Sequence, residues 1–425
     1  MNIRFANQFF WPDEAATSQI LTDLVRAVDG RVSVVCAAGG YTPGSAAAGP
    51  PPEGIHVARV GTSRFGHGKL RKLASYAGFY AGAAWRMLSG PRADVVVTMT
   101  TPPLLGLIGW AAQRLRGSRH FLWEMDVYPD VATSLGLFRS GGPFDRIVGW
   151  IADGPRRRAD GILVLGPCMA DRLAARGIPR GLLFEADNWA DGSEIRPMEF
   201  LRDGSLKIFY SGNAGLAHDF DTFQRAVESL AAQQPDFARR YRFRFSGGGP
   251  RMGALRAWAQ GRYPNVQFSG YAARGELGTA FGAGDVGLVT QIPETCGTVV
   301  PSKTYGILAA GRPVLFVGPV AATPARIIAE HRVGWQVDPG DSQSLAALFA
   351  WLQANPGEVE AAGRRARSVF ERNYDLPIGV TRILDYLGLP VKAEIRAEAE
   401  RRKSLSTVAG LGDFAWVPHP ETKIP

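Results

Sequence analysis

Short apolar runs alternate along the chain with longer amphipathic segments of helical length, and this rhythm occurs twice. In the first half, the runs that predict strands are residues 3–6, 32–36, 95–98, 121–123 and 162–165. In the second half, they are residues 207–210, 241–245, 266–268, 286–289 and 314–317. Strands that alternate with helices are typical of parallel sheets built from βαβ units. The pattern therefore predicts two doubly wound α/β domains.

A polar segment without clear periodicity, residues 187–202, separates the two halves and is typical of an interdomain hinge. We expect an N-terminal domain over residues 1–195 and a C-terminal domain over residues 196–372. A helical stretch over residues 373–389 is expected to pack back toward the N-terminal domain. Residues 390–425, which begin with a charged helix-like run, are expected to form a peripheral tail.

The composition describes an ordinary globular protein with a large core. Hydrophobic residues make up 46% of the 425 positions and charged residues 20%, whereas disordered chains have too little apolar surface to offset the entropy of ordering. A formal net charge of +9 favours anionic partners. The basic residues form no recognisable nucleic-acid-binding module, so nucleic acid is not an expected partner.

The cysteines and the apolar segments bear on the compartment. Cys36, Cys168 and Cys296 are widely separated and lack metal-ligand or redox spacing, which indicates reduced thiols in a cytosolic protein. The longest apolar stretch, residues 102–112, is far shorter than a membrane span. We expect a cytoplasmic protein, either soluble or peripheral on the inner face of the cell membrane.

Two glycine-rich loops follow strands of the second half, where ligands bind to open parallel sheets. The first is Ser211 to Gly215, in which Gly212 and Gly215 permit close approach of the backbone to a ligand. The second, residues 246–250, contains three consecutive glycines. A structural turn and a ligand-binding loop are both compatible with it.

The third candidate is the start of a helix in the segment TVVPSKTYGILAAGRP. Ser302 is the expected N-cap, and Lys303 and Thr304 open the helix. A lysine in the first turn lies at the unfavourable end of the helix dipole, and a bound anion would offset that penalty. Helix N–H groups, a hydroxyl and an ammonium together suit a diphosphate. The alternative is a solvated surface lysine.

The sequence lacks the motifs of several other nucleotide-binding and metal-binding sites. No GxGxxG motif opens the chain and no Walker motif occurs, which disfavours a dehydrogenase or a P-loop ATPase. The histidines and cysteines show no zinc-binding spacing, so no metal site is expected.

These segments carry a resemblance. The chain resembles a family-4-type glycosyltransferase of the GT-B fold over roughly residues 1–388, and is similar to the bacterial subgroup that builds surface polysaccharides and other glycoconjugates. Six segments in the same order carry the resemblance: NQFFWPDEAATSQILTDL, WEMDVYPDVATSLGL, DNWAD, YSGNAGLAHDFDTF, FSGGGP and VVPSKTYGILAAGRP.

The resemblance implies two Rossmann-like domains that face a central cleft, with the donor on the C-terminal domain and the acceptor mainly on the N-terminal one. It implies transfer of a hexose-type sugar from a nucleotide diphosphate sugar to a lipid-linked or polysaccharide acceptor. It also implies retention of anomeric configuration, with no metal and no cofactor besides the donor substrate.

Positions carry over from the family one by one. The diphosphate is expected to meet Ser302, Lys303 and Thr304 and the loop that contains Gly212, Asn213 and Gly215. The other expected donor-site residues are Tyr271 beside the base, Gly248 and Gly249 along the approach, and Ala15, Ala16 and Thr17 in an interdomain phosphate loop.

The chain also departs from the family pattern. Thr298 and Gly306 stand where family members commonly carry two glutamates, the second of which binds ribose, so Glu294 becomes the candidate ribose ligand. Asn213 and His218 replace an arginine and a lysine that often neutralise the diphosphate. Lys303 is then the main candidate cation.

Three carboxylates, Glu124, Asp126 and Asp130, are expected at a strand's carboxyl end, facing the cleft. We rank Asp126 first as the proton acceptor for the acceptor hydroxyl, because it occupies the aspartate of the family's His-Asp-like element. Met125 replaces the usual histidine or glutamine. The alternative is that Asp126 caps the next helix.

Residues 59–92 contain seven basic residues and no acidic one, interleaved with aromatic side chains. A basic, aromatic-rich helix of this kind can lie on an anionic membrane surface. Alternatively, one apolar stripe docks the helix on the sheet. That stripe consists of Leu70, Leu73, Ala77, Tyr80, Ala84 and Leu88.

Two other functions remain open at this point. The missing glutamates at Thr298 and Gly306 are compatible with a catalytically silent GT-B subunit that binds a nucleotide sugar or regulates a partner. A sugar-nucleotide epimerase with the GT-B fold is the other alternative.

Overall fold

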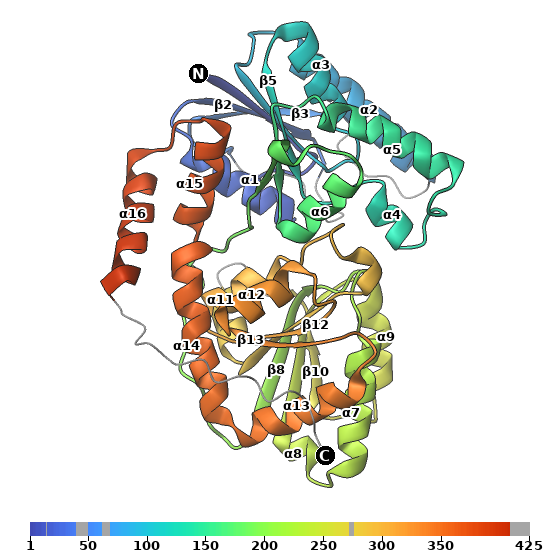
Figure 1. Ribbon diagram of the computed structural model, residues 1–425, viewed down its shortest axis with the longest axis vertical. Helices are drawn as coiled ribbons and strands as arrows, with labels where there is room; N and C mark the ends of the chain where they lie inside the picture. The colour runs from blue at the N-terminus through green and yellow to red at the C-terminus, as the bar shows by residue number, and fades with distance from the viewer. Residues whose placement is uncertain (14, 40–49, 62–68, 272–275, 409–425) are drawn as a thin grey trace.

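The computed structural model describes residues 1–13, 15–39, 50–61, 69–271 and 276–408 (Figure 1). Two Rossmann-like α/β domains are confirmed, each with a parallel sheet covered by helices. The domains lie one above the other in Figure 1, and helices α14 (Pro356–Asn373) and α15 (Leu376–Leu387) run along one side of both.

The N-terminal sheet has the strand order β3-β2-β1-β4-β5-β6-β7. Its strands are β1 (Asn2–Ala6), β2 (Arg31–Ala37), β3 (Ile55–Val60), β4 (Val95–Met99), β5 (Arg119–Glu124), β6 (Gly161–Val164) and β7 (Leu183–Glu185). Its helices are α1 (Ala16–Ala27), α2 (Lys69–Leu88), α3 (Gly106–Arg116), α4 (Asp130–Ser134), α5 (Pro143–Arg156) and α6 (Pro167–Ala175). The two strands that the hydrophobic pattern missed, β3 and β7, are the two edges, where burial is incomplete and the apolar signal is weak.

The C-terminal sheet has the order β10-β9-β8-β11-β12-β13. Its strands are β8 (Leu206–Asn213), β9 (Tyr241–Gly248), β10 (Val266–Ser269), β11 (Val286–Thr290), β12 (Val314–Val317) and β13 (Gly334–Val337). Its helices, besides α14, are α7 (Asp221–Gln233), α8 (Phe237–Arg240), α9 (Pro250–Ala259), α10 (Leu277–Gly282), α11 (Lys303–Ala309), α12 (Thr323–His331) and α13 (Ser342–Ala354). The edge strand β13 was also missed.

The expectation that loops begin at Ser211 and Ser246 was wrong, because β8 and β9 continue in register through Asn213 and Gly248. A Cβ atom on Gly247 would lie 2.1 Å from the carbonyl oxygen of Gly212. Glycine therefore allows the two strands to stay paired at this end.

Helix α2 docks on the N-terminal sheet. Phe79, Ala83 and Met87 are buried in a core cluster that also contains Val60 and Val96. Each of these buried residues precedes by one position a residue of the apolar stripe predicted from the sequence. The stripe residues Tyr80, Ala84 and Leu88 are only partly buried against the same cluster. The basic residue Arg64 and the aromatic Phe65 lie outside the described residues, as do the side chains of Leu70 and Leu73.

The C-terminal end of the chain returns to the N-terminal domain. Val380, Ile383 and Leu384 of α15 join the N-terminal core cluster. Beyond it, Val391 forms a β-bridge with Val28, and Ala399 of α16 (Ala393–Val408) is buried. Most other side chains described over residues 391–404 are half-buried or exposed, so the expectation of a peripheral tail stays a prediction. Among the helices of the described part of the chain, none is long and apolar enough to cross a bilayer.

Candidate functional site

The side chain of Lys303 lies against the loop that follows β8. Its Nζ donates to the carbonyl oxygen of Asn213 and to Nε2 of His218, each at 3.2 Å, and lies 5.0 Å from the centre of the Tyr210 ring. The alternative of a solvated surface lysine is therefore wrong. Ser302 stands at the N-cap position, although its side chain makes no capping hydrogen bond.

The hydrogen bonds of His218 define its tautomer. Nδ1 lies 2.8 Å from the carbonyl oxygen of Thr290, which can only accept, so Nδ1 carries the proton. Nε2 then accepts from Lys303. Burial, with a further contribution from the Lys303 charge, lowers the pKa of His218 to about 3, so the ring stays neutral.

Lys303 holds its charge among neutral partners. Burial lowers its pKa to about 8, because a desolvated ammonium is less stable than a solvated one. Among the described residues, no carboxylate forms an ion pair with it. The site therefore offers an anion a cation that is already positioned.

Glycines make room for this arrangement. Gly212 has φ +125°, and a Cβ atom there would lie 2.8 Å from Cε of Lys303. A Cβ atom on Gly249 would lie 2.3 Å from Oδ1 of Asn213. A Cβ atom on Gly248 would lie 3.1 Å from Cε2 of Tyr271, whose side chain is largely exposed. The structure thus brings Gly212, Asn213, Gly248, Gly249, Tyr271 and Lys303 together.

The remaining residues that were predicted to bind the donor are Thr304, Gly215 and the alanines and threonine at the start of α1. The contacts of these residues differ from those of the group around Lys303. The hydroxyl of Thr304 is buried and donates to the carbonyl oxygen of Pro301, which argues against a contact with a diphosphate. Around Gly215 the structure is open, with no neighbouring atom closer than 3.8 Å to a Cβ atom added there. Ala15 is the N-cap residue of α1, and Ala16 and Thr17 form its first turn.

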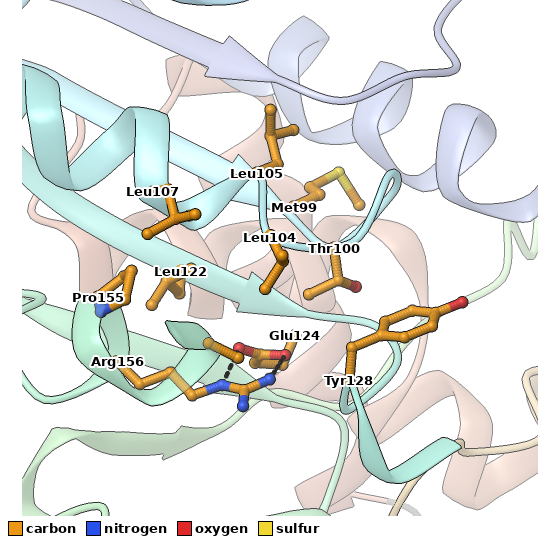
Figure 2. A pocket seen from close by; sticks show the side chains of 12 residues that line it. Met99, Thr100, Leu104, Leu105, Leu107, Leu122, Glu124, Tyr128, Pro155 and Arg156 are labelled. Atoms are coloured by element: carbon orange, nitrogen blue, oxygen red, sulfur yellow. Dashed lines mark hydrogen bonds and ion pairs between the residues drawn. The ribbon is translucent and has the colours of Figure 1, made fainter. Parts of the chain in front are cut away.

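Two of the three predicted catalytic carboxylates are held in ion pairs. Glu124 is buried and accepts two hydrogen bonds from Arg156, at 2.8 and 3.1 Å (Figure 2). Asp130 accepts from Arg172 at 2.7 Å and from Arg176 at 2.8 Å. These carboxylates have structural partners and are not free proton acceptors, so the expectation that they face the cleft as catalytic groups is corrected.

Asp126 lies where the two domains meet. Its backbone forms a β-bridge with Val299, and the next N–H, of Val127, donates to the carbonyl oxygen of Thr298 at 2.9 Å. Burial, and secondarily the charge of Glu124, raises the pKa of Asp126 to about 6. The alternative that Asp126 caps the next helix is wrong, because α4 has Pro129 at its N-cap.

The positions of the missing glutamates have packing roles. Thr298 is buried, and its hydroxyl donates to the carbonyl oxygen of Thr295 at 2.9 Å. A Cβ atom on Gly306 would lie 2.8 Å from Cε2 of Phe281, so this position has no space for a glutamate. Glu294 is exposed on a short 3-10 turn, and its role as a ribose ligand stays a prediction.

The structure also shows groupings that the sequence did not indicate. The side chains of Cys168 and Cys296, from different domains, lie close enough to affect each other's pKa, and the Cys168 Sγ lies 3.2 Å from Oγ1 of Thr323. A cavity of about 20 Å³ beside the Glu124 pair is too small for a sugar (Figure 2). A polar pocket of about 270 Å³ lies where Asp187, Arg326 and Arg382 meet.

Among the described residues, no group of three or more histidine, cysteine, aspartate or glutamate side chains could hold a metal ion.

Comparisons with known proteins agree with this architecture. Residues 15–184 match the family described as glycosyl transferase 4-like domain, and residues 205–355 match glycosyl transferases group 1. The chain is 26% identical over 294 residues to the probable glycosyltransferase WbjE of Pseudomonas aeruginosa, covering 67% of this chain and 71% of WbjE.

Solved structures share the fold at low identity. The structure of Anabaena HepE in complex with UDP-glucose has a TM-score of 0.66 and 16% identity, covering 91% of this chain and 99% of HepE. The structure of WaaG, a glycosyltransferase involved in lipopolysaccharide biosynthesis, has a TM-score of 0.63 and 15% identity, covering 91% of this chain and 99% of WaaG.

Proposed function

We propose a specific reaction for this chain, which belongs to the family-4-type glycosyltransferases of the GT-B fold. The enzyme transfers a hexose-type sugar from a nucleotide diphosphate sugar to a lipid-linked or polysaccharide acceptor. We further propose that transfer retains the anomeric configuration, needs no metal ion, and takes place in the cytoplasm at the inner membrane face. The UDP-glucose bound to HepE and the role of WaaG in lipopolysaccharide biosynthesis support the donor and acceptor classes.

The observation that carries the proposal is the position of Lys303. Its ammonium is held by Asn213 and His218, which satisfy hydrogen bonds without neutralising charge. A diphosphate leaving group gains negative charge as its bond to the sugar breaks, and a positioned cation stabilises that charge. Lys303 supplies this stabilisation in the proposed reaction, and the exposed ring of Tyr271 supplies a surface for the base.

Asp126 is the proposed proton acceptor. The acceptor hydroxyl oxygen forms a bond to the anomeric carbon, the bond from that carbon to the diphosphate oxygen breaks, and the hydroxyl proton passes to the Asp126 carboxylate. A pKa raised to about 6 leaves this carboxylate ionised at neutral pH and more basic than an ordinary aspartate.

A panel of UDP-, GDP- and dTDP-sugars tests the proposal with the purified protein. Thermal shift identifies the donor, because a ligand that binds only the folded state raises Tm. Release of nucleoside diphosphate and a glycosylated product are expected with that donor. Binding without turnover would instead support a catalytically silent subunit, and interconversion of nucleotide sugars without transfer would support an epimerase.

A further inference from the structure

Helix α5 and the segment before it expose an unusual number of large apolar side chains. Phe144, Ile147 and Trp150 follow one another at three-residue spacing on the outer face of α5, with 55%, 58% and 75% of their surfaces exposed. Leu137 and Phe138, in the preceding segment, are also exposed, and the rings of Phe138 and Phe144 lie 4.7 Å apart. We call these five residues the apolar ridge.

Water is an unfavourable environment for this ridge. Single exposed apolar residues are common on soluble proteins, but a contiguous group of aromatic and aliphatic side chains marks an interaction surface. The opposite face of α5 is fixed to the domain by the buried residues Gly149, Ala152 and Arg156. The helix is therefore held in place, with its apolar face directed outward.

Positive charge surrounds the ridge. Arg139 and Arg146 are exposed beside the apolar side chains, and Arg157 and Arg158 are exposed at the end of α5. Of the nearby acidic residues, Asp153 is buried against Arg156 and Arg176, whereas Asp145 accepts from the neutral N–H of Gly141 and keeps its charge, so the exposed arginines outnumber it. An apolar stripe bordered by arginines matches the interface of an anionic bilayer, where apolar side chains enter the acyl boundary and cations meet headgroups.

The charge distribution also argues against a second copy of the chain as the occupant. A two-fold symmetric contact would place the same patch against itself. The arginines that border the ridge would then face one another, which is unfavourable without intervening anions. A lipid surface supplies those anions.

The ridge is continuous in sequence with the proposed acceptor site. Asp126 ends the segment after β5, α4 follows at Asp130 and packs against the short turn that carries Glu294, and the chain then passes through Leu137 into α5. In Figure 1, α4 lies between α5 and the C-terminal domain. Helix α4 therefore links the ridge to the segment in which Asp126 lies.

We propose that the apolar ridge and its arginines form the membrane-docking surface of this enzyme, which binds anionic phospholipid and delivers a lipid-linked acceptor to Asp126. The inference rests on the proposed function for the acceptor, but the docking itself does not. It also replaces α2 as the main membrane contact, because α2 buries Phe79 and Met87 against the sheet.

Vesicle co-sedimentation of the full chain tests the docking. Binding to vesicles of phosphatidylglycerol and phosphatidylethanolamine is expected, with binding at least tenfold weaker to phosphatidylcholine alone. Ile147→Ser/Trp150→Ser should reduce binding to the anionic vesicles at least tenfold. The matched control, Leu201→Ser/Trp351→Ser, removes an exposed aliphatic side chain and an exposed tryptophan from the C-terminal domain and should bind like the wild type.

Charge and self-association are measured separately. Arg139→Gln/Arg146→Gln should weaken vesicle binding about tenfold and reduce its dependence on salt, since charges near a lipid surface act through screened attraction. Size-exclusion chromatography with light scattering should give the same mass for the wild type and the ridge variant. A wild-type dimer that the ridge variant converts to monomer would overturn the proposal in favour of self-association.

Nucleotide binding separates the two proposals. Thermal shift with UDP should be unchanged in the ridge variant, which shows that its fold and donor site are intact. Equal vesicle binding by the wild type and the ridge variant would overturn the docking surface and leave the proposed transfer intact. Normal docking without transfer to any acceptor would overturn the proposed function alone.

Discussion

Nζ of Lys303 lies 3.2 Å from Nε2 of His218, although 85 residues separate them in the chain. The histidine is neutral and accepts this hydrogen bond, because its other ring nitrogen donates to Thr290. In the sequence, His218 stands at a position where family members often carry a cationic residue. The structure gives this histidine another role. His218 orients the remaining cation without competing for the anion.

Lys303→Gln should weaken binding of the donor's nucleoside diphosphate. A hydrogen bond to a charged group contributes about 1.5–3 kcal/mol, which corresponds to roughly 10- to 150-fold in Kd. Isothermal titration calorimetry measures the change. The wild-type affinity should also fall as pH rises through about 8, because Lys303 then loses its proton.

Lys207→Gln is the matched control for this variant. Lys207 pairs with Asp203 at the amino end of β8, away from Lys303, so its loss should leave the Kd unchanged. Equal affinities for the wild type and Lys303→Gln across pH 7 to 9 would contradict the assignment of Lys303 to the diphosphate.

Gly212→Ala should damage the same site through the backbone. Alanine is strained at φ +125°, and its Cβ would displace the Lys303 side chain. Strain of this kind costs about 1–3 kcal/mol. Thermal unfolding and calorimetry should show a lower Tm together with weaker binding of the nucleoside diphosphate.

Gly253→Ala provides the comparison. Gly253 lies in α9 with no atom near its missing Cβ, and alanine is the better helix former. This variant should keep the affinity and the Tm of the wild type or raise the Tm slightly. A loss of affinity in both variants would show that the effect is not specific to Gly212.

The hydrophobic pattern predicted the buried strands well and the edges poorly. Val95 to Thr98 and Val286 to Val289 are almost fully buried, and such strands are read from continuous apolar runs. Strands β3, β7 and β13 lie at sheet edges, where half-buried residues weaken the signal. The extensions of β8 and β9 ended in glycines, which in sequence are typical of loops.

The sequence could not indicate which side chains, far apart in the chain, become partners in the fold. The choice among Glu124, Asp126 and Asp130 depends on Arg156, Arg172 and Arg176, whose positions follow only from tertiary packing. Likewise, the separation of 128 positions between Cys168 and Cys296 gave no sign that the two thiols meet between the domains.

Arg156→Met should destabilise the N-terminal domain strongly. The substitution leaves Glu124 buried without its partner, and removal of one member of a buried ion pair costs about 3–5 kcal/mol. Urea unfolding should show the loss. Glu124→Gln/Arg156→Met should recover part of it, because the uncompensated charge is then absent; a double variant less stable than the single one would contradict this account.

The Cys168 and Cys296 thiols should form a disulfide when diamide oxidises them. The neighbouring Cys296 thiol holds the pKa of Cys168 well below its usual range, so the Cys168 thiolate attacks the diazene, and Cys296 then displaces the hydrazine product. Peptide mapping identifies the bond. Cys36 is the internal control, because burial raises its pKa to about 11, and it should remain reduced.

Asp126→Asn should abolish transfer while donor binding persists. Loss of a general base costs about 10²- to 10⁴-fold in rate, and the fall should appear in kcat/KM measured with the donor identified by thermal shift. In the wild type, kcat/KM should rise with pH up to about 6, because the carboxylate must be ionised to accept a proton, and should fall as pH rises through about 8, because Lys303 then loses its proton. The variant should lose this rise.

Stability separates this role of Asp126 from a structural one. Because the pKa of Asp126 is raised in the folded state, its contribution to stability is present below the unfolded value of 3.8 and is lost as pH rises through about 6. Asp126→Asn removes an unfavourable charge, so at pH 8 the variant should be at least as stable as the wild type. Lost activity together with a lowered Tm at pH 8 would assign Asp126 to the contact between the domains instead of to proton transfer.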